Sequence, residues 1–292
     1  MDPMYKPGKY VVAVSGGVDS MVLLDLLTRM PSLELVVAHF EHGVREDSTE
    51  DLRLVQAAAV HYRLPFVYAR GNLGAGVSEA DARAARYAFL HQTRQEHGAA
   101  SIVTAHHQGD VVETAMLNML RGTGRRGLSS LKSTDTIVRP LLAHTKQELL
   151  HYAAANNIQW REDSTNSDER YLRNYLRHRV VPKMTPEQHA ALLGYIAKAQ
   201  QLNHEIDAAL HQYIQSGELD RRWFIMLPHA VSAEVMAAWL RYNSAAFDRR
   251  GIDRLVVFGK TAMSGKQADV DKNSKLHAGK EHITLVVKSS TP

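Results

Sequence analysis

The stretch Val11-Val12-Ala13-Val14-Ser15-Gly16-Gly17-Val18-Asp19-Ser20 decides how this chain folds. Its first four residues are small and apolar, which is typical of a buried parallel strand. Residues 21–27 continue as an apolar helix that should end before Pro31. A strand, a glycine-rich turn and a helix N-terminus together form an anion site, because free backbone N–H groups and the helix dipole face the anion.

The polar residues of this loop indicate which anion binds. Gly16 and Gly17 let it approach the backbone, and Ser15 and Ser20 can add hydroxyl groups. Asp19 would repel phosphate unless a cation lay between them, so we expect Mg²⁺ at Asp19. The alternative interpretation is an ordinary strand-to-helix turn. The loop is not of the G-x-x-x-x-G-K-[ST] type, because no lysine follows the glycines.

Composition limits the class of protein. The 292 residues are 45% apolar and 23% charged, which predicts a soluble globular protein with two domains. No apolar run approaches roughly 18 residues, so we expect no membrane span, and the first residues lack a signal-peptide pattern, so we expect a cytoplasmic location. The absence of cysteine excludes disulfides, thiolate metal sites and thiol chemistry. A net charge of +4 is compatible with an RNA partner.

The order of apolar segments predicts an α/β fold with a parallel, Rossmann-type nucleotide-binding sheet followed by a small second domain. We expect domains at 1–185 and 217–292, joined by a helix at 186–216. Further strands are predicted at 33–40, 65–70 and 101–105, with an edge strand at 136–142, and helices at 48–63, 78–98, 108–120, 145–157, 171–180, 228–242 and 248–259.

Two acids open the helix predicted at 108–120. Asp110 and Glu113 are three residues apart, so they share one helix face near its N-terminus. Their favourable position in the helix dipole is a purely structural alternative. A metal site with His106 and His107 is a third interpretation, although the spacing is not that of H-E-x-x-H. The residues expected to point into the core are Val112, Met116, Met119 and Leu120.

Three arginine-rich segments suit phosphate groups. Arg83, Arg86 and Tyr87 should lie close together on one helix. Residues 121–128 (RGTGRRGL) include Arg125 and Arg126 and no acid, which suits an RNA backbone or ATP phosphates. In the helix at 171–180, Arg173 and Arg177 stack four residues apart, while Leu172, Leu176 and Val180 should point inward. Solvated surfaces are the alternative for all three segments.

The string S-G-G-x-D-S resembles the pyrophosphate loop of the ATP pyrophosphatases, which leave AMP on a substrate oxygen. Over roughly residues 10–184 the chain resembles the tRNA(Ile)-lysidine synthetase family, through motifs in the same order. They are SGGVDS at 15–20, HFEHGVR at 39–45, ARAARY at 82–87, TAHHQGDVVET at 104–114, LRGTGRRGL at 120–128, RPLL at 139–142, EDSTN at 162–166 and RNYLRHRVVP at 173–182.

The resemblance implies a two-step reaction that uses ATP and Mg²⁺. ATP adenylates the C2 oxygen of the cytidine at the first anticodon position of an isoleucine tRNA with a CAU anticodon, and the ε-amine of free L-lysine then displaces AMP. It assigns catalytic roles to Asp19, Arg86, Asp110 and Glu113, and metal binding to Asp19. It places ATP at Ser15, Gly16, Gly17, Val18, Asp19 and Ser20 and at the backbone of Ala38, His39 and Phe40. It places lysine at Asp110 and Glu113, and tRNA at Arg125, Arg126, Arg173 and Arg177.

The chain also departs from the family pattern. Gly109 and Val111 replace the first Asp and the Gln of H-H-x-D-D-Q, which predicts weaker Mg²⁺ binding, and Ser164 replaces a usual proline. The length corresponds to a short form without a third domain, and a homodimer is compatible with the resemblance. Two other functions stay open: a pyrophosphate-loop ligase acting on a small molecule, and an RNA-binding homologue that has lost catalysis.

Overall fold

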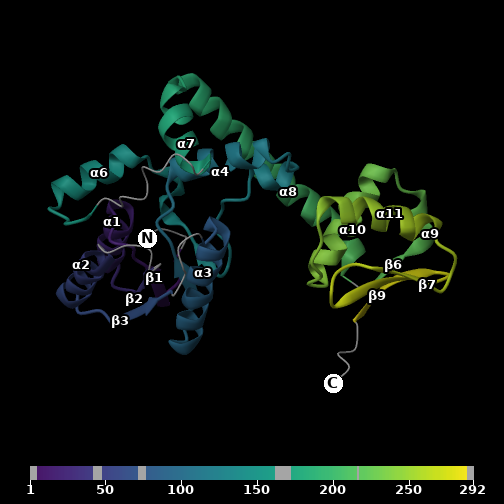
Figure 1. The fold of residues 1–292 in the computed structure, drawn as a ribbon, viewed down its shortest axis with the longest axis horizontal. Helices are drawn as coiled ribbons and strands as arrows, with labels where there is room; N and C mark the ends of the chain where they lie inside the picture. The colour runs from purple at the N-terminus through teal and green to yellow at the C-terminus, as the bar shows by residue number, and fades with distance from the viewer. Residues whose placement is uncertain (1–4, 42–47, 72–76, 162–171, 216, 288–292) are drawn as a thin grey trace. The chain divides into compact units, whose positions relative to one another are not determined.

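The computed structural model describes residues 5–41, 48–71, 77–161, 172–215 and 217–287. The chain divides into two units, Met1–Ala199 and Gln200–Pro292, and each is described by itself (Figure 1). The motif at 162–166, with Ser164, lies outside the described residues, as do residues 42–45 of the segment at 39–45.

The first unit is built on a five-stranded parallel sheet with the order β3-β2-β1-β4-β5. The strand before the glycine-rich loop is β1, at the centre of the sheet, which confirms the predicted Rossmann-type fold. The strands are β1 (Gly8–Ala13), β2 (Leu33–Glu41), β3 (Phe66–Arg70), β4 (Ser101–Val103) and β5 (Ile137–Val138).

Helices cover both faces of this sheet because side chains alternate along each strand. From β1, Val12 packs on the same side as helices α1, α2 and α6, whereas Val11 packs on the opposite side, against α3. The helices of this unit are α1 (Val18–Thr28), α2 (Ser48–His61), α3 (Glu79–Glu96), α4 (Gln108–Leu120), α5 (Arg125–Leu128), α6 (Lys146–Ala155) and α7 (Leu172–Tyr175).

A buried carboxylate ties α1 to its neighbours. Asp25 of α1 accepts hydrogen bonds from the hydroxyl groups of Tyr62 (2.8 Å) and Tyr152 (2.7 Å) and from Nε of Arg29 (3.0 Å). Burial opposes its ionisation, but these donors outweigh burial and lower the pKa of Asp25. Since Tyr152 belongs to α6 and Tyr62 follows α2, one side chain holds three segments together.

The edge strand is shorter than predicted. Residues 136–142 were expected to form one strand, but β5 ends at Val138 and Pro140–Ala143 forms a 3₁₀ turn. The reason is Pro140, which cannot donate to a sheet and whose fixed φ suits the first position of a turn.

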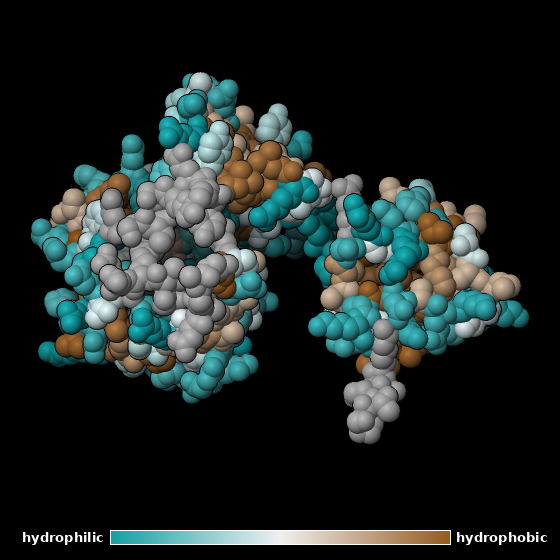
Figure 2. Space-filling view, viewed as in Figure 1, coloured by the Kyte–Doolittle hydropathy of each residue, from teal (hydrophilic) through white to brown (hydrophobic). Residues whose placement is uncertain are grey.

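The apolar face of α4 is only partly the one predicted. Met119 and Leu120 are exposed, and Figure 2 shows hydrophobic surface in the region of α4. Val112 is buried as predicted, and Val111 and Ala115 are buried as well, where they pack with Ile196 of α8 (Pro186–Ile214). The prediction was wrong for Met119 and Leu120 because helical spacing alone does not show which turns of a helix other elements cover.

The arginine-bearing helix is irregular. After α7, residues Leu176–Val180 form a π-helical turn and Val181–Lys183 a 3₁₀ turn. Leu176 is buried as predicted, but Leu172, the first residue of α7, is exposed. The wider turn breaks the 3.6-residue period between Leu176 and Val180. Tyr171 lies outside the described residues.

The second unit packs helices on a four-stranded antiparallel sheet of order β6-β9-β8-β7. Arg221 is buried in this unit and donates hydrogen bonds to the backbone oxygens of Gly259 (3.1 Å), Gly279 (2.7 Å) and Ala262. Its other elements are β6 (Glu218–Asp220), α9 (Arg221–Met226), α10 (His229–Tyr242), α11 (Arg249–Thr261), β7 (Lys266–Asp269), β8 (Ser274–Ala278) and β9 (His282–Val287).

The helix predicted to connect the domains is α8, which begins in the first unit and ends in the second. Thr185 and Gln188 cap its N-terminus, since each accepts a hydrogen bond through its side chain from the backbone N–H of the other. None of the helices in the described ranges is long and apolar enough to cross a bilayer.

Candidate active site

The glycine-rich loop is held in shape by its own hydroxyl groups. Ser20 accepts a hydrogen bond from the backbone N–H of Ser15 (3.1 Å) and donates one to the backbone oxygen of Gly17 (2.9 Å). Gly16 has φ +95°, a conformation that side-chain-bearing residues rarely adopt. Ser20 therefore shapes the loop, and the loop leads directly into α1.

The N-terminus of α1 presents backbone N–H groups at the end of the central strand. Among the described residues no side chain caps this helix at Gly17. The neighbouring oxygen of Gly16 accepts from the backbone N–H of Arg161 (3.0 Å), so the loop is tied to the segment after α6. An uncapped helix start behind two glycines is a suitable place for an anion.

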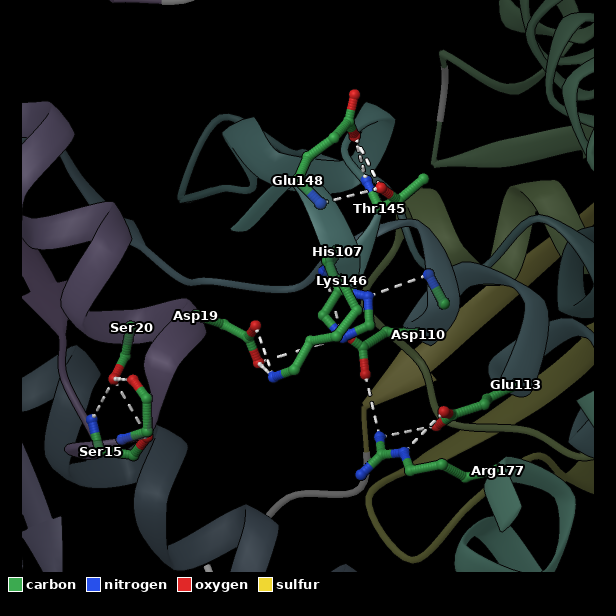
Figure 3. A network of polar contacts seen from close by, with 12 residues as sticks. Ser15, Asp19, Ser20, His107, Asp110, Glu113, Thr145, Lys146, Glu148 and Arg177 are labelled. Carbon is green, nitrogen blue, oxygen red and sulfur yellow. Dashed lines mark hydrogen bonds and ion pairs between the residues drawn. The ribbon is translucent and has the colours of Figure 1, made fainter. Parts of the chain in front are cut away.

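Asp19, expected at a metal, contacts a lysine from another helix. The Nζ of Lys146 lies 2.8 Å from Oδ1 and 2.9 Å from Oδ2 of Asp19 (Figure 3). Lys146 is the first residue of α6, directly after the capping residue Thr145. The two charges neutralise each other at the edge of the loop.

His107 joins Asp19 to the acids of α4. Its Nδ1 accepts a hydrogen bond from the backbone N–H of Gly109 (3.0 Å), so Nε2 carries the ring proton. That Nε2 lies 4.0 Å from Oδ2 of Asp19 and 3.7 Å from Oδ2 of Asp110. A side chain at position 109 would place its Cβ 2.7 Å from Cε1 of His107. Gly109 is a departure from the family pattern, and because it has no side chain the ring of His107 can lie in this position.

The two acids of α4 converge on one guanidinium, as their spacing predicted they could. Arg177 donates to Glu113 through Nε (2.7 Å) and through one terminal nitrogen (2.8 Å), which also lies 3.3 Å from Asp110. Figure 3 shows the three side chains pointing toward one another. Arg177, predicted to bind tRNA, is therefore engaged with the residues predicted to bind lysine.

The environment sets the protonation of these groups. Burial raises the pKa of Glu113, and Arg177 holds that rise back. Burial also opposes the ionisation of Asp110, but the neighbouring rings of His107 and His106, the backbone N–H of His107 and the guanidinium of Arg177 outweigh it and lower the pKa of Asp110. Asp110 is thus stabilised as a carboxylate, whereas Glu113 is the better proton acceptor of the two.

The residues expected to contact adenine lie at the end of β2, next to the loop. The backbone oxygen of Ala38 accepts from Val14 (2.9 Å), and Nδ1 of the buried His39 donates to the backbone oxygen of Val14 (2.8 Å). Burial lowers the pKa of His39. The ring of Phe40 lies 5.6 Å from that of Phe89. The carboxyl end of β2 is the side of a parallel sheet where ligands bind.

A cluster of guanidinium groups lies around Tyr87. The guanidinium carbons of Arg83 and Arg86 lie 4.8 Å and 5.5 Å from the centre of its ring. Burial lowers the pKa of Arg86, and the positive charges of Arg83 and Arg173 lower it further. Such a concentration of positive charge favours a bound anion. The other predicted tRNA contacts, Arg125 and Arg126, lie on α5.

Two residues of this site were missed by the sequence analysis, His107 as a bridging group and Lys146 altogether. Lys146 offered a signal: a lysine in the first turn of a helix is unfavourable in the helix dipole, so an acid from elsewhere should lie nearby. The bridging role of His107 had no such signal, because it depends on the absence of a side chain at Gly109.

The donor set fits Mg²⁺ that arrives on a nucleotide. In the described part of the chain no three metal-ligating side chains cluster. Mg²⁺ is commonly held by one or two carboxylates together with phosphate oxygens and water, and Asp19 can supply one carboxylate beside the loop.

Comparison with known proteins identifies the first unit. A family model described as "PP-loop domain" matches residues 2–184. The chain belongs to the PP-loop domain family. It is 36% identical over 270 residues to the tRNA(Ile)-lysidine synthase of Thermus thermophilus, covering 88% of this chain and 52% of the relative. It is 40% identical over 193 residues to the enzyme of that name from Geobacter sulfurreducens, covering 61% of this chain and 41% of the relative.

The PP-loop chain thus spans about half the length of the curated relatives it matches. Among solved structures it is similar to the U34-tRNA thiolase NcsA from Methanococcus maripaludis with its 4Fe-4S cluster. The TM-score is 0.57 at 15% identity, over 69% of this chain and 74% of the other. At that identity the likeness shows a common fold.

Proposed function

We propose that this chain ligates free L-lysine to C2 of the first anticodon cytidine of an isoleucine tRNA with a CAU anticodon, with ATP as the activating substrate. The observation that carries the proposal is the convergence of Asp110 and Glu113 at the start of α4, linked through His107 to Asp19 of the loop. Similarity to tRNA(Ile)-lysidine synthases supports the choice of amino acid and tRNA.

The loop end of the site serves the first half of this reaction. The cytidine C2 oxygen attacks the α-phosphate of ATP, and pyrophosphate leaves. Backbone N–H groups at the start of α1 would bind the phosphates, and the backbone from Ala38 to Phe40, at the carboxyl end of β2, would contact the adenine. Mg²⁺ carried by the nucleotide would be held by Asp19 and would offset charge on the departing pyrophosphate. Arg86 would stabilise negative charge near the adenylate.

The acid end serves the second half. The ε-amine of lysine attacks C2 of the activated cytidine, and AMP leaves with its bonding electrons. Lysine is cationic, so it needs carboxylates to bind and must lose a proton before it attacks. Asp110, whose carboxylate is stabilised, suits the ammonium, and Glu113, whose pKa burial raises, suits the proton. Arg177 must share these acids with lysine or move away from them.

The arginines outside this network are proposed to hold the tRNA. Arg125 and Arg126 on α5 and Arg173 on α7 suit phosphate groups near the anticodon. We also propose a cytoplasmic location, a homodimer, and tRNA contacts by the second unit. Their support is the resemblance and the basic composition.

A lysine-incorporation assay tests the proposal. Purified protein is mixed with ATP, Mg²⁺, labelled lysine and unmodified isoleucine tRNA with a CAU anticodon, and we expect label in the tRNA only when ATP is present. Asp110→Asn should abolish incorporation and keep ATP binding, whereas Glu34→Gln, a change at an exposed acid of β2, should alter neither incorporation nor ATP binding. No incorporation by the unchanged protein that binds ATP and tRNA would refute the function. ATP cleavage without any tRNA would favour a small-molecule ligase.

A further inference from the structure

Lys146 occupies a position that its local structure does not favour. It is the first residue of α6, where the helix dipole repels a cation. Its ammonium is nevertheless held against both carboxylate oxygens of Asp19, at 2.8 Å and 2.9 Å. The acid in this pair belongs to the first turn of α1, directly after the glycine-rich loop. The ammonium therefore lies at the edge of the anion site.

The backbone of Lys146 is held by the capping of α6, whereas its side chain is held through the ion pair with Asp19. Thr145 and Glu148 form a reciprocal capping box at the start of α6, with the backbone N–H of Thr145 2.6 Å from Oε2 of Glu148 (Figure 3). Further along, Tyr152 bonds to Asp25 of α1. The side chain of Lys146 is 45% exposed, so it can reorient on a fixed base.

Charge balance predicts where the side chain of Lys146 moves when a nucleotide binds to the loop. Asp19 alone would repel a polyphosphate, and a divalent cation on the nucleotide would compete with Lys146 for the carboxylate. Once displaced, an ammonium at this edge has phosphate oxygens as its nearest new partners. A flexible lysine is well suited to such an exchange because it acts as a point charge with three rotatable donors.

We propose that Lys146 is a polyphosphate-binding residue of the nucleotide site, which neutralises Asp19 in the free protein and transfers to the phosphates beyond the α-phosphate when nucleotide binds. This rests on the proposed function only in that a nucleotide occupies the loop. In the adenylation step, Lys146 would bind the pyrophosphate as the bond from the α-phosphate to the bridging oxygen breaks and that oxygen takes the electron pair.

A structural role as a tether between α1 and α6 is the competing explanation. Exposed ion pairs contribute little to stability, and Asp25 with Tyr152 already joins these helices. The two explanations differ in what they predict for ligands: a tether would affect all nucleotides through stability, whereas a polyphosphate contact would affect only ligands that have phosphates beyond the first.

Binding measurements on Lys146→Met distinguish them. Equilibrium dialysis or calorimetry with α,β-methylene-ATP, pyrophosphate and AMP is done with Mg²⁺ present. Since a hydrogen bond to a charged group is involved, we expect Lys146→Met to weaken the binding of α,β-methylene-ATP and of pyrophosphate about tenfold or more. The binding of AMP should weaken less than about twofold. Lys146→Arg should recover part of the loss. The matched control is Lys9→Met, which removes a similarly exposed ion pair, to Glu34, from β1.

The outcomes separate this inference from the proposed function. The inference is wrong if Lys146→Met binds α,β-methylene-ATP as tightly as the unchanged protein does. It is also wrong if the affinity for AMP falls by the same factor as the affinity for α,β-methylene-ATP. In both cases nucleotide binding by the loop stands. If the unchanged protein binds none of the three ligands, both the inference and the ATP-dependent function fail. If polyphosphate binding depends on Lys146 but no lysine reaches tRNA, the inference holds and only the proposed substrates are wrong.

Discussion

Replacing Asp25 by asparagine should destabilise the first unit by about 2 kcal/mol. Asn has the same shape, but its single oxygen can accept from only one of the two tyrosine hydroxyls, which lie 2.7 Å and 2.8 Å from the carboxylate. The other hydroxyl then faces an amide donor and loses a hydrogen bond to a charged acceptor, worth about 1.5–3 kcal/mol. The contact with Arg29 is left out of this figure because solvent screens that exposed guanidinium.

The effect should depend on pH with a definite sign. The pKa of Asp25 is lowered in the folded protein, so the unfolded chain binds more protons in acid. The stabilisation is therefore fully present above the unfolded pKa of about 4 and is lost as the pH falls through the lower folded value. The advantage of the unchanged protein over Asp25→Asn should shrink over that range.

Urea unfolding at several pH values, with hydrogen exchange resolved for α1 and α6, measures this difference. Glu34→Gln is the matched control, since it removes an exposed carboxylate whose oxygen lies 3.6 Å from Lys9, and its effect should stay within about 0.5 kcal/mol. A difference of that small size for Asp25→Asn at neutral pH, or one that persists unchanged in acid, would refute the reasoning.

Three further changes probe other parts of the chain. Gly16→Ala should lower the free energy of unfolding by about 1–2 kcal/mol, because the residue has φ +95°, and should weaken ATP binding at least tenfold. Gly98→Ala is its control: at φ +60° in a remote turn, this change should destabilise the protein by a similar amount and leave ATP affinity unchanged. Arg221→Met should destabilise the second unit by about 3 kcal/mol, because three backbone carbonyl groups lose their donor. ATP binding should not change, because the glycine-rich loop belongs to the first unit, and a parallel loss of ATP binding would contradict this expectation. Arg177→Met should raise the pKa of Glu113 further and move the acid limb of lysine-dependent activity to higher pH, and an unchanged pH–rate profile would show that Glu113 is not the proton acceptor.

The order of strands and the place of the loop were predictable from sequence because both depend on local patterns. Apolar runs bounded by turns predicted β1 to β4. The helices predicted to begin at residues 78 and 145 are α3 and α6, whose N-caps are Ser78 and Thr145. The buried face of α4 was not predictable in the same way. It is set by packing against α8 and Leu131, and the exposed end of the helix carries apolar residues as well.

In the candidate site, too, the features that depend on local sequence were predictable and those that depend on tertiary structure were not. The spacing of Asp110 and Glu113 was enough to place them on one face, since a helix determines that face. Their partner Arg177 is 64 residues from Glu113 in sequence and was assigned to RNA, because nothing local distinguishes a guanidinium that meets an acid from one that meets a phosphate. Lys146 and Asp19 are 127 residues apart, and only tertiary structure brings them together.

A continuous series of polar contacts runs from Lys146 through Asp19, His107 and Asp110 to Arg177. In the proposed reaction, this series would couple the binding of nucleotide to the binding of lysine. A ligand that removes Lys146 from Asp19 changes the field at His107, and through it the carboxylate that awaits the amino acid. Linkage is reciprocal: if nucleotide alters the affinity for lysine by some factor, lysine must alter the affinity for nucleotide by the same factor. Calorimetric titration of each ligand in the presence of the other measures that coupling, which in the proposed reaction would favour lysine binding at the stage when the cytidine is activated.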